Sequence, residues 1–88
     1  MSNINEIIRD IKDNKIKYPE LRQGETFVDG RIFLHLYKQN GTEVGEGRLF
    51  NSLEDGVKYF GSLELQGEYY IVCKETKNPS SWRINIKF

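Results

Sequence analysis

The chain has 88 residues, of which 38% are hydrophobic and 30% are charged, and its 13 basic residues are balanced by 13 acidic ones. A chain of this length supports one modest hydrophobic core, so we expect a single domain over residues 1–88. The balanced charge excludes long-range electrostatic steering of the whole molecule toward nucleic acid or an anionic membrane, so any charged surface must come from local patterning.

The N-terminal segment NINEIIRDIKDN predicts an amphipathic helix. It carries isoleucines at the i, i+3, i+4, i+7 spacing of one helix face, namely Ile4, Ile7, Ile8 and Ile11. Asn3 supplies an N-cap, and Glu6 stands where a capping box requires an acidic or amide residue. Pro19 prevents the helix from continuing beyond Tyr18, because a residue that precedes proline avoids helical geometry.

From Arg31 onward the hydrophobic period changes to two, which is typical of strands. The stretch RIFLHLYKQNGTEVGEGRLF contains Asn-Gly, a strong hairpin signal, and so predicts a strand over 31–38 that turns back into a strand over 43–50. Gly45 and Gly47 weaken the second strand and indicate a bulge or a close approach of the backbone to its neighbour.

The segment NSLEDGVKYFGS predicts a second, short helix. Ser52 and Asp55 supply its cap, and Gly61 stands where the helix is expected to end. Gly56 in its interior costs about 1 kcal/mol relative to alanine, so tertiary packing must hold this helix together. Its apolar face is formed by Leu53, Val57 and Phe60.

The C-terminal segments GEYYIVCKE and WRINIKF predict two more strands, the last with a strict alternation of apolar and polar residues. The chain therefore has the order α-β-β-α-β-β, and we expect an α+β fold, a small two-layer domain with an antiparallel sheet. Each helix has one apolar face, so both helices are expected to pack on the same face of the sheet. The other face, called the open face below, is then left partly accessible to water.

The alternation of the strands assigns a row of polar and aromatic residues to the open face. The first and last strands contribute Arg31, Phe33, His35, Tyr37, Arg83, Asn85 and Lys87. The third strand adds either Tyr70 and Lys74 or Tyr69 and Cys73, depending on its register. This face is expected to be locally basic. Acidic residues are expected elsewhere, at positions such as Glu54, Asp55 and Glu64.

A basic and aromatic sheet face suits two kinds of partner. A protein partner is favoured because Tyr, Phe, Trp and Arg anchor protein interfaces. Single-stranded nucleic acid is the alternative, because rings stack on unpaired bases at ~1–3 kcal/mol each while Arg and Lys contact phosphates. RIFLHLY and GEYYIV are also similar to the two sheet motifs of RNA-recognition domains, although that fold has a strand before its first helix.

Two interpretations need no foreign partner. Cross-strand aromatic and charged pairs stabilise a sheet without any ligand, and a homodimer could bury the same face. An edge strand could also recruit a strand from another chain. With a partner bound at the open face, the predicted contact residues are Arg31, Phe33, His35, Tyr37, Tyr70, Arg83 and Lys87.

The sequence predicts no catalytic residues, no cofactor site and no metal site, so we expect a protein that is not an enzyme. The only histidine, His35, lies in a predicted strand without a neighbouring cysteine, and Cys73 belongs to no CxxC motif. GTEVGEG lacks the Lys-Ser/Thr pair of a phosphate-binding loop. A small enzyme that uses His35 and Cys73 is the third alternative.

The sequence also indicates a compartment. It has no signal-peptide pattern and no apolar run of about 18 residues, as a membrane-spanning helix would require. Cys73 is the only cysteine and has no internal disulfide partner, which fits a reducing environment. We therefore expect a cytoplasmic protein with no membrane partner.

The opening NINEIIRDIK resembles the N-terminal helix of small phage-encoded anti-CRISPR proteins that inhibit Cas9-type nucleases. The hairpin at KQNG and the short helix at SLEDGVKYF follow in a similar order, so the resemblance covers up to two-thirds of the chain. It implies a phage or mobile-element protein that binds a host protein or protein–nucleic-acid complex stoichiometrically. That family binds through a dense acidic surface, whereas YYIVCKETKNPSSWRINIKF is basic and strand-like, so no binding residue is carried over.

Overall fold

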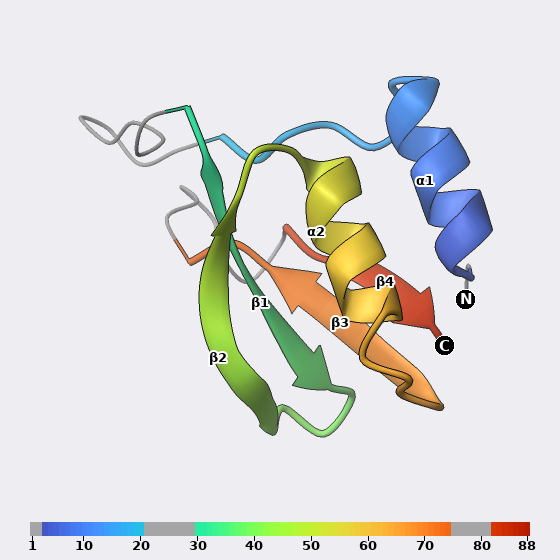
Figure 1. The fold of residues 1–88 in the computed structure, drawn as a ribbon, viewed down its shortest axis with the longest axis vertical. Helices are drawn as coiled ribbons and strands as arrows, with labels where there is room; N and C mark the ends of the chain where they lie inside the picture. The colour runs from blue at the N-terminus through green and yellow to red at the C-terminus, as the bar shows by residue number, and fades with distance from the viewer. Residues whose placement is uncertain (1–2, 21–29, 75–81) are drawn as a thin grey trace.

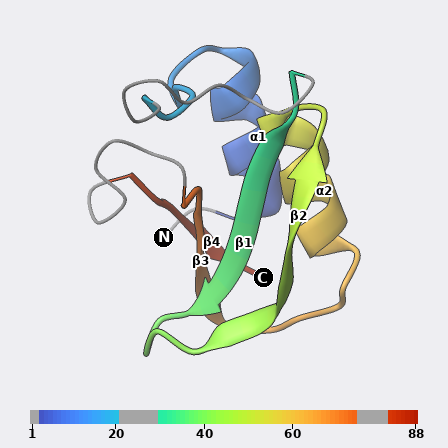
Figure 2. The same cartoon turned by 90° about the vertical axis from the view of Figure 1, so that its left-hand side faces the viewer.

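The computed structural model describes residues 3–20, 30–74 and 82–88. Its helices are α1 (Ile4–Lys12) and α2 (Leu53–Gly61), and its strands are β1 (Ile32–Lys38), β2 (Glu43–Phe50), β3 (Glu68–Val72) and β4 (Ile84–Lys87). The strands form one antiparallel sheet in the order β2-β1-β3-β4. Both helices lie on the same side of this sheet (Figures 1 and 2). The predicted two-layer α+β fold and its element order are confirmed.

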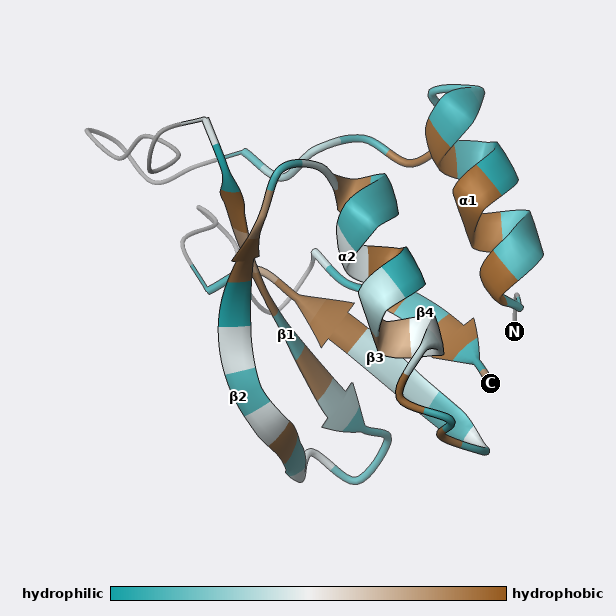
Figure 3. Cartoon of the chain, viewed as in Figure 1, coloured by the Kyte–Doolittle hydropathy of each residue, from teal (hydrophilic) through white to brown (hydrophobic). Residues whose placement is uncertain are grey.

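α1 begins where the sequence predicts and ends earlier than Pro19 would require. The side chain of Asn3 accepts a hydrogen bond from the backbone N–H of Glu6 at 3.0 Å. After Lys12 the chain leaves the helix because Asn14 adopts a left-handed φ of 59°, and the N–H of Lys15 donates to the carbonyl of Asp10 at 2.8 Å. The isoleucine stripe of α1 is visible in Figure 3. Neither helix in the described part of the chain has the length and apolar character needed to cross a bilayer.

α2 packs closely on the sheet because a glycine lies at the contact. Ser52 caps the helix by accepting a hydrogen bond from the N–H of Asp55 at 3.1 Å. A Cβ atom at Gly56 would lie only 2.5 Å from Cδ1 of Leu34 and 3.2 Å from Cδ2 of Phe50. The low helix propensity of Gly56 is therefore offset by a helix–sheet spacing that a side chain would prevent.

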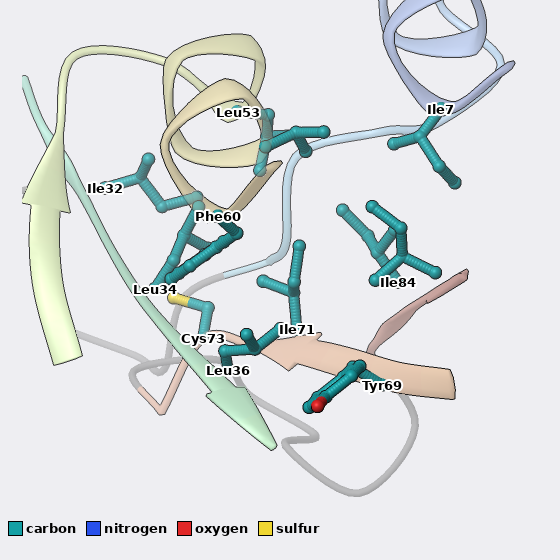
Figure 4. Packing of buried hydrophobic residues seen from close by; sticks show 12 residues of the cluster. Ile7, Ile32, Leu34, Leu36, Leu53, Phe60, Tyr69, Ile71, Cys73 and Ile84 are labelled. Atoms are coloured by element: carbon teal, nitrogen blue, oxygen red, sulfur yellow. The ribbon is translucent and has the colours of Figure 1, made fainter. Parts of the chain in front are cut away.

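The hydrophobic core fills the space between the helices and the sheet (Figure 4). Its buried members are Ile7, Ile32, Leu34, Leu36, Leu53, Val57, Phe60, Tyr69, Ile71, Cys73, Ile84 and Ile86. The burial of Tyr69 and Cys73 decides the register of the third strand, so Tyr70 and Lys74 belong to the open face. Trp82 is half-buried beside this core, and its indole N–H donates to the carbonyl of Lys17 at 3.1 Å.

The β1–β2 hairpin contains both features predicted for its glycines. The pairing changes from Leu36 with Val44 to Leu34 with Arg48, so one residue of β1 faces the three residues 45–47 of β2 in a bulge. Gly45 adopts a left-handed φ of 62° in this bulge. At Gly47, the ring of Phe33 occupies the space that a Cβ atom would need. The bulge and the close backbone approach are confirmed.

The contact at Gly56 gives the first prediction. Gly56→Ala should raise helix propensity by about 1 kcal/mol but force the fully buried Leu34 to move, and overpacking of a core costs about 1–3 kcal/mol. We expect a net loss of unfolding free energy, measured by urea denaturation with the fluorescence of Trp82. Arg9→Ala, at an exposed position of α1, is the control and should change stability by less than about 0.5 kcal/mol. An unchanged or stabilised Gly56→Ala variant would show that α2 is free to move away from the sheet.

The second prediction concerns the carboxylate that joins the two helices. Glu54 lies 3.2 Å from the ammonium of Lys58 and 3.6 Å from that of Lys12 on α1. The hydrogen bond from Lys58, with the charge of Lys12, lowers the pKa of Glu54 below its ordinary value. Its stabilising contribution is therefore present at neutral pH and is lost as the pH falls through the folded-state pKa.

Glu54→Gln should consequently lower stability at pH 7 and lose less stability than the parent protein on acidification. Urea denaturation at a series of pH values from about 7 to about 3 measures both effects. Glu20→Gln removes an exposed carboxylate that has no ion pair among the described residues, and it serves as the control. Parallel pH curves for Glu54→Gln and the parent protein would contradict the bridging role of Glu54.

Candidate functional site

The open face carries a cross-strand ladder of stacked side chains. Tyr37 and Tyr70 are direct partners on β1 and β3, and their rings are nearly parallel, with an interplanar angle of 6° and centroids 5.4 Å apart. The guanidinium carbon of Arg83 lies 4.4 Å from the centroid of the Tyr70 ring. We call Tyr37, Tyr70 and Arg83 the stacked ladder. Three of the seven predicted contact residues are thus brought into direct contact.

The strand order determines which parts of the ladder are accessible. β3 lies between β1 and β4, so Tyr37 and Arg83 approach the ring of Tyr70 from opposite sides. Both faces of this ring are therefore covered by neighbouring side chains. The ladder presents ring edges, hydroxyl groups and a guanidinium group to solvent, and it offers little free ring face at Tyr70.

A charged cluster holds the hydroxyl end of the ladder. The hydroxyl of Tyr37 donates to Oε1 of Glu43 at 3.3 Å, and the ammonium of Lys74 lies 3.6 Å from the same oxygen. The hydrogen bond between Lys74 and Tyr37 raises the pKa of Lys74, and the charge of Glu43 raises it further. Lys74 is therefore cationic throughout the physiological pH range, and the cluster restricts the rotation of Tyr37.

The charge of the open face differs from the prediction. Glu43 lies on this face opposite Tyr37, and Glu68 lies opposite Lys87 in the β3–β4 register. Acidic side chains are thus mixed with Lys74, Arg83 and Lys87, and the face is less basic than the sequence analysis expected, although Glu54 and Asp55 lie on α2 as predicted. The position of Glu43 could have been predicted from the turn. Tyr37 and Glu43 lie three positions before and after Asn40, so they pair in this hairpin and share a face.

His35 lies on the predicted face, but the residue is only 4% exposed, which leaves its imidazole little surface for the partner contact that the sequence analysis predicted. Its Nε2 atom lies 3.0 Å from the carbonyl oxygen of Gly45, which requires this nitrogen to carry the proton and donate. Its ring centroid lies 4.8 Å from that of Tyr37. The bulge of β2 covers the imidazole. His35 therefore packs beside the ring of Tyr37 on the same face of β1 and limits the movement of that ring.

The remaining predicted contact residues lie around the ladder. Arg31, just before β1, and Lys87, near the end of β4, are exposed at separate places on the sheet. Phe33 is half-buried against Gly47 and is paired with Leu49 of β2, which the sequence analysis did not single out. The open face therefore has an apolar corner at the start of β1 in addition to the polar ladder.

The structure places the two residues of the enzyme hypothesis, His35 and Cys73, on different sides of the sheet. Within the ranges 3–20, 30–74 and 82–88, no three His, Cys, Asp or Glu side chains are grouped as a metal ion would require. His35 lies on the open face, whereas Cys73 is buried in the core on the other side of the sheet. These two side chains do not form a common site.

Comparisons with protein-family models, with curated proteins and with solved structures found no match to this chain.

The third prediction tests whether the ladder exists as an energetic unit. A double-mutant cycle with Tyr70→Leu and Arg83→Ala should give a coupling energy of about 0.5–1 kcal/mol, because the guanidinium stacks on the ring. Urea denaturation of the four proteins measures this coupling. Tyr70→Leu combined with Lys87→Ala is the control cycle and should be additive, since the cation–π contacts among the described residues include Arg83 with that ring and not Lys87. Equal coupling in the two cycles would argue against a specific ladder.

Proposed function

We propose that the protein is a small non-enzymatic binding protein that acts stoichiometrically as an inhibitor or modulator of a host macromolecule. The observation that carries this proposal is the stacked ladder, a group of aromatic and guanidinium side chains on a sheet face that carries no described helix. Tyrosine and arginine are the residue types that most often dominate the binding energy of protein interfaces.

The ladder suits binding because its side chains are already ordered. Tyr37 is held by Glu43 and by the buried ring of His35, and Tyr70 is held between Tyr37 and Arg83. Ordering flexible side chains at an interface costs about 0.5–1.5 kcal/mol for each one. A surface in which these side chains are fixed before association avoids much of that cost.

The geometry favours a protein partner over single-stranded nucleic acid. A base stacks on a free ring face, and both faces of Tyr70 are covered. Glu43 and Glu68 on the same face also repel phosphates. Single-stranded nucleic acid is the second candidate because Arg83 and Lys87 are exposed on one side of β4.

The source and target class rest on the sequence resemblance. The N-terminal helix and the following hairpin resemble those of anti-CRISPR proteins, which supports an origin in a phage or mobile element and a cytoplasmic host target. The binding surface proposed here is the sheet face of β1, β3 and β4. This surface differs from the dense acidic surface of that family. The proposed target is therefore a host protein or a protein–nucleic-acid complex, and it is bound in a different way.

The fourth prediction tests the face directly. Immobilised protein is offered a purified Cas9-type nuclease with its guide RNA and, separately, a nuclease-treated bacterial lysate. Tyr37→Ala combined with Arg83→Ala should abolish capture of the protein partner, because the double variant removes both neighbours of the Tyr70 ring. Circular dichroism verifies that the double variant is folded.

Arg9→Ala combined with Lys15→Ala removes two exposed cationic side chains from the α1 region and should leave capture unchanged. Capture by the folded Tyr37→Ala, Arg83→Ala variant would exclude the open face as the binding surface. A parallel titration with single-stranded DNA and RNA tests the second candidate, single-stranded nucleic acid. Binding is followed by Trp82 fluorescence at low and physiological salt. Saturable binding that weakens steeply with salt would favour nucleic acid over a protein partner.

A further inference from the structure

A second candidate surface lies on the helix side of the sheet, along β2, which is an outer edge strand. A groove of about 300 Å³ separates β2 from α2, and it is lined by Val44, Gly45, Glu46, Arg48, Tyr59, Phe60 and Leu63. The opposite edge strand, β4, is bridged at Lys87 by Asn3. β2 is therefore the more accessible edge in the part of the chain that the structure describes.

The edge of β2 carries two opposite charges that are not paired with each other. Glu46 and Arg48 are both exposed, and neither takes part in an ion pair among the described residues. The guanidinium carbon of Arg48 lies 4.7 Å from the centroid of the Tyr59 ring, which fixes its position on the rim of the groove. The most exposed large apolar side chains of the described residues include Leu49 at 39% and Leu63 at 40%, which flank this edge.

We propose that β2 forms a symmetric homodimer by lying antiparallel to β2 of a second copy, with the two-fold axis at Gly47. In this register Glu46 of each copy lies opposite Arg48 of the other, so one contact generates two ion pairs. Leu49 of each copy lies opposite Gly45 of the other, where an added Cβ atom would meet nothing within 4 Å. Charge and shape are thus both self-complementary about a single axis.

The bulge in β2 determines whether backbone or side-chain groups carry the proposed contact between the two copies. Residues 45–47 interrupt the regular pairing of β2 with β1, so we expect few regular backbone hydrogen bonds between the two copies along this part of the edge. The side chains on both sides of Gly47 therefore carry the contact. An isologous contact of this kind closes at two copies and does not propagate into a fibre.

This interface is separate from the stacked ladder, and it reaches the open face only at Leu49, beside Phe33. Val44, Glu46 and Arg48 line the groove on the helix side of the sheet, whereas Tyr37, Tyr70 and Arg83 lie on the open face. Dimer formation through β2 leaves the stacked ladder accessible. The two proposals consequently make different predictions and fail independently.

The fifth prediction is a charge-exchange experiment on the oligomeric state, measured by sedimentation equilibrium from about 1 µM to about 1 mM protein. The parent protein should dimerise, and Glu46→Arg and Arg48→Glu should each weaken the dimer by about tenfold or more, since symmetry doubles every repulsive contact. The combined variant exchanges the charges and should restore the parent affinity to within about threefold. Added salt should weaken the parent dimer.

Glu46→Arg leaves the Arg48–Tyr59 contact in place, so this variant and the salt series still test the proposal if Arg48→Glu does not fold. Glu20→Arg, an exposed charge reversal away from β2, is the control and should not change the dimer. A parent protein that is monomeric throughout the concentration range would overturn the proposal. So would a folded combined variant as weak as the single variants, or a control that weakens the dimer equally.

Discussion

The fold depends on how closely β2 approaches β1 around His35. At the middle of β1 both sides of the strand are buried, with Leu34 and Leu36 in the core and the imidazole of His35 on the other side. The buried N–H of this imidazole needs an acceptor, because an unsatisfied buried polar group costs about 1–3 kcal/mol. The carbonyl of Gly45 provides it, and that position requires the left-handed backbone that glycine adopts readily. Gly47 then leaves room for the ring of Phe33.

The bulge also determines where the open face is flat enough to bind a partner. A bulge bends its strand and increases the local twist, and Figure 1 shows β2 as the bent outer strand of the sheet. β1, β3 and β4 pair without such an interruption over the residues that carry Tyr37, Tyr70 and Asn85. The stacked ladder stands on this regular part. The imidazole that the bulge covers also contacts the ring of Tyr37, so the bulge and the ladder are mechanically connected.

Local patterns in the sequence predicted the elements and the two faces of the sheet, because hydrophobic periodicity and capping residues act within a few positions. The caps at Asn3 and Ser52, the hairpin and its bulge are of this kind. The burial of His35 was not predicted because it depends on the three-dimensional shape of the bulge in β2, and the placement of Glu68 opposite Lys87 was not predicted because it depends on the register of β3 with β4. The stacking of Tyr70 between Tyr37 and Arg83 similarly requires the strand order, which no local pattern encodes.

The placement of the two surfaces gives a reason for having both. The ladder occupies the open face, and the groove of Glu46 and Arg48 lies on the helix side of the edge strand. A dimer joined through β2 would present two ladders on one continuous assembly, because the contact involves neither Tyr37, Tyr70 nor Arg83. A second binding event on the same target is then intramolecular, and its effective concentration raises the overall affinity without any new contact. A protein of 88 residues with a small open face can thereby reach high affinity for its target without a larger binding surface.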